Sequence, residues 1–134
     1  MNEKMDDGDM LFKKSLPILP ADNFKSLHDN LAALSARALI EFVSEGFEKG
    51  RIDGEKQSPS LVSYCSKITK NDSEILKDDG LSQILGKIRA FSPFPGAYIF
   101  FGSKRVKLLE AVYEHATLRI TKVKPEGKGE MTCK

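Results

Sequence analysis

The sequence predicts a mixed α/β chain in which a strand and one long helix come first and a small β-rich unit follows. Three observations support this prediction. Apolar residues recur every three or four positions between residues 24 and 42, as they do along one face of a helix. The stretch SPFPGA at residues 92–97 stops any helix, because proline fixes φ and has no N–H to donate. After it, apolar and basic residues alternate, which is typical of strands.

Size and composition indicate a single soluble domain. The chain has 134 residues, of which 40% are hydrophobic and 30% are charged. It contains no apolar run of about 18 residues, so we expect no membrane-spanning helix. Residues 1–10 lack the apolar centre of a secretory signal. Cys65 and Cys133 are too few for a disulfide framework or a metal cluster, so we expect no metal and a reducing, cytoplasmic location.

The front half is predicted to hold one strand, one long helix and a linker. The strand is expected over residues 9–20 and stops at two prolines, which cannot donate to a ladder. The helix is expected over residues 22–50, with Asp22 as its N-cap. Its apolar surface is wider than one stripe and has no full sheet to cover it, so we expect low stability. Residues 51–80 are polar and rich in turn formers, as in a linker.

The back half is predicted to be a helix that leads into a small antiparallel β unit. The helix is expected over residues 81–91, because Pro93 and Pro95 exclude the residues before them from the α region. The hairpin turn is expected at residues 102–105. Strands are expected at residues 97–101, 106–113 and 117–124. The aromatic residues near the proline corner are interpreted as core: Phe91, Phe94, Tyr98, Phe100 and Phe101.

Charge is distributed unevenly along the chain. Residues 1–80 carry 11 Lys/Arg and 15 Asp/Glu, a balance of −4, whereas residues 81–134 carry 10 and 4, a balance of +6. This asymmetry indicates that the back half faces a polyanion, although a solvated charged surface would give the same counts. The candidates for phosphate contact are Lys87, Arg89, Lys104, Arg105, Lys107, Arg119, Lys122 and Lys124.

Several motifs together resemble those of the methionyl-tRNA formyltransferase family. DDGDML at residues 6–11 resembles the D-x-G-D-M-L motif near the end of that family's catalytic domain. SYCSKITKNDSEI at residues 63–75 is similar to its interdomain connection. IRAFSPFPGAY at residues 88–98 is similar to the signature that opens its C-terminal domain, and LRITKVKPEGKGEM at residues 118–131 is similar to its last strand. The resemblance covers nearly the whole chain, in the family's order.

The resemblance implies a three-part organisation and an activity. Residues 1–50 would be the remnant of a Rossmann-like catalytic domain, residues 51–80 the interdomain linker, and residues 81–134 a shortened, partial OB-like domain that binds tRNA. Such enzymes transfer a formyl group from 10-formyltetrahydrofolate to the amino group of methionine on initiator tRNA. Matching the motifs places the catalytic aspartate on Asp6, and Met5 and Asp6 would contact the folate.

The resemblance also implies a truncated enzyme. The family's Asn-x-His motif, which polarises the formyl carbonyl, is absent from these residues, so we expect this chain alone to be inactive. We expect a monomer that binds initiator methionyl-tRNA and neither DNA nor a membrane. Two alternatives stay open. One is a non-catalytic RNA-binding module, and the other is a fragment of a sugar-nucleotide amine formyltransferase, whose C-terminal domain begins with a similar proline corner.

Overall fold

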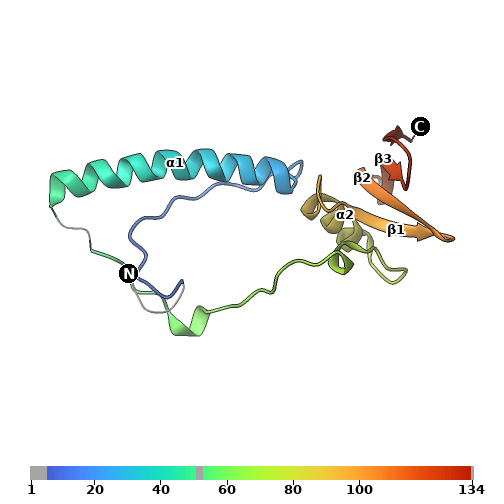
Figure 1. Ribbon diagram of the computed structural model, residues 1–134. Helices are drawn as coiled ribbons and strands as arrows, with labels where there is room; N and C mark the ends of the chain where they lie inside the picture. The colour runs from blue at the N-terminus through green and yellow to red at the C-terminus, as the bar shows by residue number, and fades with distance from the viewer. Residues whose placement is uncertain (1–5, 51–52, 134) are drawn as a thin grey trace. The chain divides into compact units, whose positions relative to one another are not determined.

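The computed structural model describes residues 6–50 and 53–133, which form two α-helices and a four-stranded antiparallel sheet (Figure 1). The α-helices and strands are α1 (Phe24–Lys49), α2 (Leu81–Ala90), β1 (Ala97–Phe101), β2 (Lys104–Glu114), β3 (Thr117–Pro125) and β4 (Met131–Thr132), and two single-turn 3-10 helices lie at Pro59–Leu61 and Asn71–Ser73. They divide into two compact units: unit 1 comprises the described residues of 1–18 and 28–66, and unit 2 those of 19–27 and 67–134. Within the described residues, neither helix combines the length and hydropathy needed to cross a bilayer.

In unit 1, most of α1 is exposed to solvent. An extended segment before it runs beside the helix (Figure 1), where Phe12 meets Phe42 edge to face with ring centroids 6.0 Å apart. An ion pair of 2.6 Å between Lys14 and Glu41 adds a second contact. None of the residues whose burial is described in unit 1 is fully buried. The apolar surface of α1 is therefore broad, as expected, and only partly covered.

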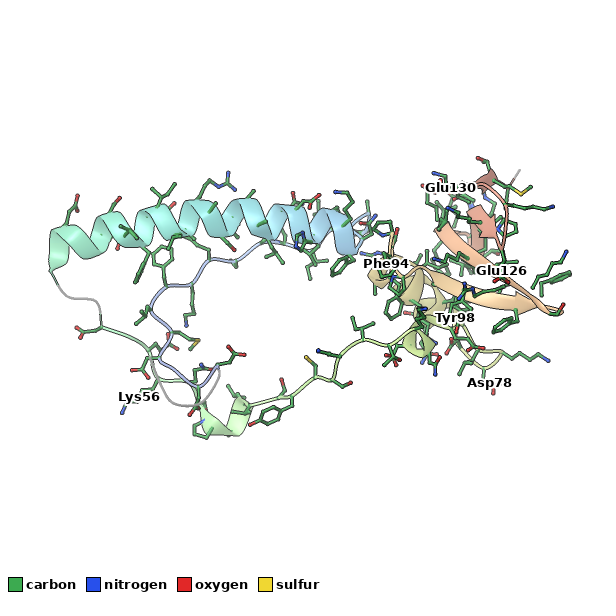
Figure 2. All side chains as sticks on the ribbon, in the orientation of Figure 1. Lys56, Asp78, Phe94, Tyr98, Glu126 and Glu130 are labelled. Atoms are coloured by element: carbon green, nitrogen blue, oxygen red, sulfur yellow. The ribbon has the colours of Figure 1, made fainter. Side chains whose placement is uncertain are left out.

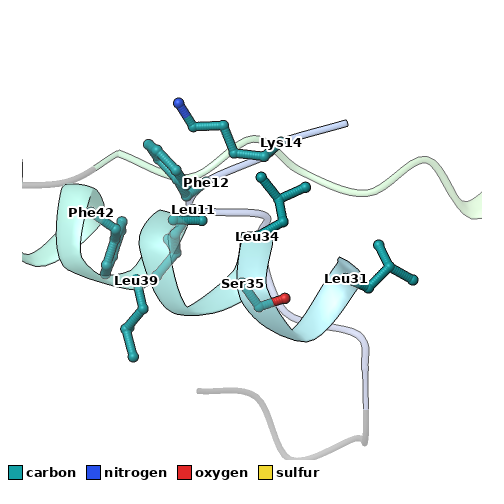
Figure 3. Close-up of a pocket in the computed structure, with 9 residues that line it drawn as sticks. Leu11, Phe12, Lys14, Leu31, Leu34, Ser35, Leu39 and Phe42 are labelled. Atoms are coloured by element: carbon teal, nitrogen blue, oxygen red, sulfur yellow. The ribbon is translucent and has the colours of Figure 1, made fainter. Parts of the chain in front are cut away.

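A shallow groove of about 410 Å³ lies between α1 and this extended segment (Figure 3). Its lining is mainly apolar and consists of Leu11, Phe12, Lys14, Leu31, Leu34, Ser35, Ala38, Leu39 and Phe42. Outside the groove, Ile40 is 68% exposed. Unit 1 thus leaves apolar side chains in contact with water on more than one side of the helix.

The strand expected over residues 9–20 is not formed. Met10 and Glu55 make one isolated antiparallel bridge, with backbone hydrogen bonds of 2.8 and 2.9 Å. The following residues are extended but take part in no ladder. A strand needs a neighbouring strand that accepts and donates hydrogen bonds along its length, and the described part of unit 1 provides only this bridge. The prediction was wrong because the alternation of residues along one segment does not show whether a partner strand is present.

The start of α1 differs from the prediction by one residue. Asn23 is the N-cap, since its Oδ1 accepts the Ser26 N–H at 3.0 Å. In return, Ser26 Oγ accepts the Asn23 N–H at 3.0 Å, which completes a reciprocal cap. The predicted cap, Asp22, instead accepts the Leu19 N–H at 2.8 Å and the Ser26 hydroxyl at 2.9 Å. These two hydrogen bonds, the one from Leu19 first, lower the pKa of Asp22.

Unit 2 contains a small hydrophobic core between α2 and the sheet (Figure 1). Ile88 of α2 is 2% exposed and packs with Ala97 of β1 and Leu108 of β2. Partly buried neighbours complete this core: Ile75, Ile84, Ile99, Val106, Ala111, Ile120 and Val123. Burial of these aliphatic groups is the main favourable term for unit 2. The helix predicted at residues 81–91 is observed as α2, one residue shorter, and it packs against the sheet.

The strands of the sheet are antiparallel neighbours in the order β1-β2-β3-β4. The first three match the predicted strands within a few residues, whereas β4 was not predicted. The first turn is shorter than expected: it consists of Gly102–Ser103, and Lys104 already pairs with Phe101. The second turn places two non-glycine residues, His115 and Ala116, at φ values of 51° and 60°. Both turns are therefore of the tight, two-residue kind.

The aromatic side chains near the proline corner do not all join the core. Tyr98 is only 7% exposed, although it lies on the other face of the sheet from the cluster around Ile88. Phe94, Phe100 and Phe101 are 76%, 56% and 81% exposed. The ten-residue helix α2 covers one face of the sheet and only part of it. The core interpretation is therefore wrong for these three phenylalanines. Aliphatic residues supply most of the core in their place.

Candidate nucleic-acid interface

The register of the sheet decides which side chains share a face. Directly paired residues of antiparallel strands point to the same side, and successive residues alternate. The pairs Tyr98–Lys107, Phe100–Arg105 and Lys107–Lys124 therefore place their side chains together, opposite the core of unit 2. We call the surface formed by Arg105, Lys107 and Lys124 the basic face.

Two of the three cations on the basic face are oriented by neighbouring groups. The Arg105 guanidinium lies 5.5 Å from the ring centroid of Tyr98. Burial, followed by the hydrogen bond to Glu74, raises the pKa of Tyr98, so this ring stays a neutral phenol. Lys107 Nζ donates to the Pro95 carbonyl at 2.6 Å. These contacts restrict both side chains before any ligand arrives.

Glycine at position 96 makes room for Lys107. Gly96 has a φ of 85°, a conformation that other residues rarely adopt. A Cβ at this position would lie 3.0 Å from Lys107 Cδ. The corner before β1 therefore depends on glycine, both for its backbone path and for the position of the lysine.

Lys87 and Arg89, predicted to contact phosphate, are engaged inside unit 2. Lys87 Nζ forms an ion pair of 2.6 Å with Asp79 and donates to the Glu74 carbonyl at 2.6 Å. Arg89 donates to the backbone carbonyls of Asp22 and Leu19 at 2.6 and 3.0 Å. Both side chains therefore contribute hydrogen bonds to the fold.

Two other predicted cations, on β3, lie close to carboxylates. Arg119 is 3.9 Å from Glu114. Lys122 is 3.3 Å from Glu110 and 3.5 Å from Glu130, and these two partners raise the pKa of Lys122. The remaining four cations form no ion pair with a carboxylate of the described residues: Lys104, Arg105, Lys107 and Lys124. The assignment of all eight to tRNA stays a prediction.

The predicted catalytic residue lies on an exposed turn of unit 1. Asp6 has a φ of 58°, and its carbonyl, like that of Gly8, accepts a hydrogen bond of 2.8 Å from Gln57 Nε2. Met5, the other predicted folate contact, lies outside the described residues. In the described part of the chain, no group of three or more His, Cys, Asp or Glu side chains is arranged to hold a metal ion. The folate assignment stays a prediction.

Known proteins resemble the chain along most of its length. Residues 67–118 match the family described as the C-terminal domain of formyl transferases. A methionyl-tRNA formyltransferase of Syntrophus aciditrophicus is 38% identical over 111 residues, which cover 83% of this chain and 35% of that protein. A methionyl-tRNA formyltransferase of Marinobacter nauticus is 35% identical over 111 residues, which cover 83% of this chain and 35% of that protein. One of Jannaschia sp. is 30% identical and covers 100% of this chain and 50% of that protein.

The fold also has a solved counterpart. Methionyl-tRNA formyltransferase from Clostridium thermocellum superimposes with a TM-score of 0.61 at 19% identity, and the match covers 99% of this chain and 54% of that chain. The chain spans 35% to 50% of the length of the three relatives named above. The resemblance inferred from the motifs is confirmed: in sequence, this chain corresponds to the C-terminal part of the methionyl-tRNA formyltransferase family.

Proposed function

We propose that this chain is the tRNA-binding part of a methionyl-tRNA formyltransferase. The relatives carry the name of that enzyme, but this chain spans half of their length or less. The observation that supports RNA binding is the basic face of unit 2. Its cations have no carboxylate partner among the described residues, and the face lies opposite the core.

Phosphate recognition requires positive charges placed at intervals along an accessible surface. Arg105 and Lys107 meet this requirement at alternate positions of β2, and Lys124 lies directly opposite Lys107 on β3. Because Arg105 and Lys107 are already oriented by Tyr98 and Pro95, they lose less side-chain entropy when they bind. Lys104 adds a fourth cation beside the β1–β2 turn, with its side chain on the other face of the strand from Arg105.

The formyl transfer itself needs more than this chain offers. Attack of the methionine amine on a formyl carbonyl requires donors for the developing oxyanion and a group that removes a proton. Asp6 supplies one carboxylate on an exposed turn, which does not make a folate site. We therefore assign no step of the transfer to this chain alone. Asp6 and Met5 would join the active centre when the N-terminal part of such an enzyme, which binds 10-formyltetrahydrofolate, surrounds them.

We further propose a three-part organisation of the chain. Residues 1–50 are taken as the end of a Rossmann-like domain, residues 51–80 as a linker and residues 81–134 as an abbreviated OB-like domain. The four antiparallel strands and their helix support the last assignment. The protein would act as a cytoplasmic monomer in translation initiation, with initiator methionyl-tRNA as its partner and with neither DNA nor membranes as ligands.

Binding of initiator tRNA by the full 134-residue chain, measured by fluorescence anisotropy at two salt concentrations, tests RNA binding. With four phosphate contacts, the affinity should fall about 100-fold between about 50 and 200 mM salt. Binding that is undetectable at about 50 mM salt would reject this function. A formylation assay of the chain, with and without the N-terminal part of the Syntrophus relative, tests catalysis. We expect turnover only in the mixture.

A non-catalytic RNA-binding module is the second candidate, because the basic face lies entirely within unit 2. The same mixture distinguishes the two candidates. Salt-dependent RNA binding without formylation in the presence of the N-terminal part favours the module. Formylation of an amino-sugar nucleotide in place of methionyl-tRNA would favour the sugar-modifying alternative.

A further inference from the structure

A small cavity of about 190 Å³ lies beside the basic face, where the proline corner meets β1 and β2. We call it the Phe94 pocket. Its lining residues are Lys70, Ser73, Phe94, Pro95, Gly96, Tyr98, Arg105 and Lys107. Its two aromatic residues, Phe94 from the proline corner and Tyr98 from β1, can be located in Figure 2. Three of the eight lining residues are cations and none is a carboxylate.

Lys70 was not among the predicted phosphate contacts, and it lies in a turn that a hydrogen bond to its backbone holds. The Lys70 carbonyl accepts the Ser73 hydroxyl at 2.8 Å, and Ser73 is 1% exposed. The adjacent carboxylates are engaged elsewhere: Asp72 accepts the Thr69 N–H and hydroxyl. Glu74 accepts the Tyr98 hydroxyl at 3.2 Å. Lys70 has no ion pair with a carboxylate in the described residues, so its charge is available to a ligand.

The aromatic wall of the pocket is open to solvent. Phe94 is 76% exposed, so most of its ring is accessible to a ligand. Lys107 Nζ lies over one side of the Phe94 ring, 6.0 Å from its centroid, so a cation and an exposed aromatic ring are neighbours. A flat apolar surface beside positive charge is the combination that binds a base together with its phosphate.

We propose that the Phe94 pocket binds one unpaired nucleotide of an RNA strand, with the base stacked on Phe94 and the phosphate between Lys70, Arg105 and Lys107. The cavity is smaller than the roughly 300–1,000 Å³ of sites that enclose a whole small molecule, so it suits one unit of a longer polymer. This inference rests on the proposed RNA binding and adds a specific subsite to it.

The test uses the full chain, initiator tRNA, an unstructured RNA oligonucleotide and an RNA duplex of equal length. Stacking on an aromatic ring contributes roughly 1–3 kcal/mol per base, so Phe94→Leu should weaken binding of the tRNA and the oligonucleotide by a factor of about 5 to 150. Binding of the duplex should be unchanged. Phe101→Leu is the matched control, because Phe101 is 81% exposed and does not line the pocket.

Two further variants separate stacking from charge. Lys70→Ala should reduce the slope of log affinity against log salt by about 0.7 for the single strand, whereas Phe94→Leu should leave this slope unchanged. The chain contains no tryptophan, so Phe94→Trp introduces a unique fluorophore. It should keep the affinity of the parent chain, and its emission should be quenched when the oligonucleotide binds.

The outcomes distinguish a failure of the Phe94 pocket from a failure of RNA binding itself. If the parent chain binds RNA but Phe94→Leu and Lys70→Ala bind as tightly, the pocket is rejected and the basic face stands. If the parent chain binds no RNA, both are rejected. Adenosine monophosphate at millimolar concentration should not displace the oligonucleotide, and displacement would overturn the polymer subsite in favour of a free nucleotide. Circular dichroism confirms that each variant is folded.

Discussion

Arg89, near the end of α2, is hydrogen-bonded to the backbone of Asp22, two residues before α1 begins. Its Nε donates to the Asp22 carbonyl at 2.6 Å, and its Nη2 reaches the Leu19 carbonyl at 3.0 Å. The Asp22 carboxylate accepts the Leu19 N–H in the same turn. Residues 19–27 therefore belong to unit 2 although they precede it by some forty positions in the chain.

Removal of this guanidinium should destabilise unit 2. We expect Arg89→Ala to lower the free energy of unfolding by about 1.5–3 kcal/mol, because hydrogen bonds from a charged donor to two backbone carbonyls are lost. Urea denaturation followed by circular dichroism measures the change. Arg119→Ala is the control, and it should cost less than about 1 kcal/mol because its ion pair is exposed. Equal stability of the two variants would contradict the assignment.

The ion pair between Asp79 and Lys87 should make unit 2 sensitive to acid. The hydrogen bond from Lys87, followed by that from the Leu76 N–H, lowers the pKa of Asp79 below its ordinary value of 3.8. A lowered pKa in the folded state means that the stabilisation is present above 3.8 and is lost as the pH falls further. Asp79→Asn should therefore be less stable than the parent at neutral pH. This difference should shrink below 3.8, and a difference independent of pH would refute the argument.

The two lysines near the end of β3 should contribute unequally to RNA binding. Lys124 has no ion pair with a described carboxylate, whereas Glu110 and Glu130 already balance the charge of Lys122. We expect Lys124→Ala to reduce the log–log salt slope for tRNA by about 0.7–0.9, and Lys122→Ala to reduce it by less than half as much. Anisotropy titrations at several salt concentrations give both slopes. The reverse order would show that the ion pairs of Lys122 open on binding.

The turn between β2 and β3 should gain stability from glycine. Ala116 has a φ of 60°, where a Cβ is unfavourable by roughly 1–2 kcal/mol. We expect Ala116→Gly to stabilise unit 2 by about 1 kcal/mol, which corresponds to a rise in Tm of about 4–8 °C for a unit of this size. Ala116→Val should lower the Tm because a branched side chain fits this conformation less well. Calorimetry compares the three proteins.

Unit 1 should be the less stable of the two units. It has no fully buried residue among those whose burial is described, whereas unit 2 has Ile88, Ala97 and Leu108. Hydrogen exchange measured by mass spectrometry should therefore show faster exchange in the part of α1 within unit 1 than in β1 and β2. The isolated chain should lack a single cooperative transition above roughly 50 °C. Equal protection in both units would disprove this expectation.

Local patterns predicted the elements whose signals are local. The period of α2, the proline corner and the alternation of β1 to β3 all lie within short windows. The strand expected at residues 9–20 failed because pairing depends on a distant partner, and Met10 finds only Glu55. β4 was missed because it has two residues, too few for any periodicity.

The sequence predicted which cations belong to the candidate site but not how their side chains are arranged in space. Counting cations identified Arg105, Lys107 and Lys124, whose shared face follows from the register of the sheet. It could not show that Lys122 meets Glu110, because this pairing lies at an irregularity of the β2–β3 ladder. The exposure of Phe94 was also hidden, since burial depends on which part of the sheet a helix covers.

The uncovered leucines and isoleucines of α1 affect how the purified chain should be handled. Leu39 and Ile40 are 63% and 68% exposed, and such side chains promote self-association. Sulfate and similar excluded salts strengthen this attraction, while any added electrolyte weakens capture of a polyanion. Dilute buffers of low ionic strength should therefore keep the chain dispersed and ready to bind, whereas salting-out steps during purification should favour aggregates.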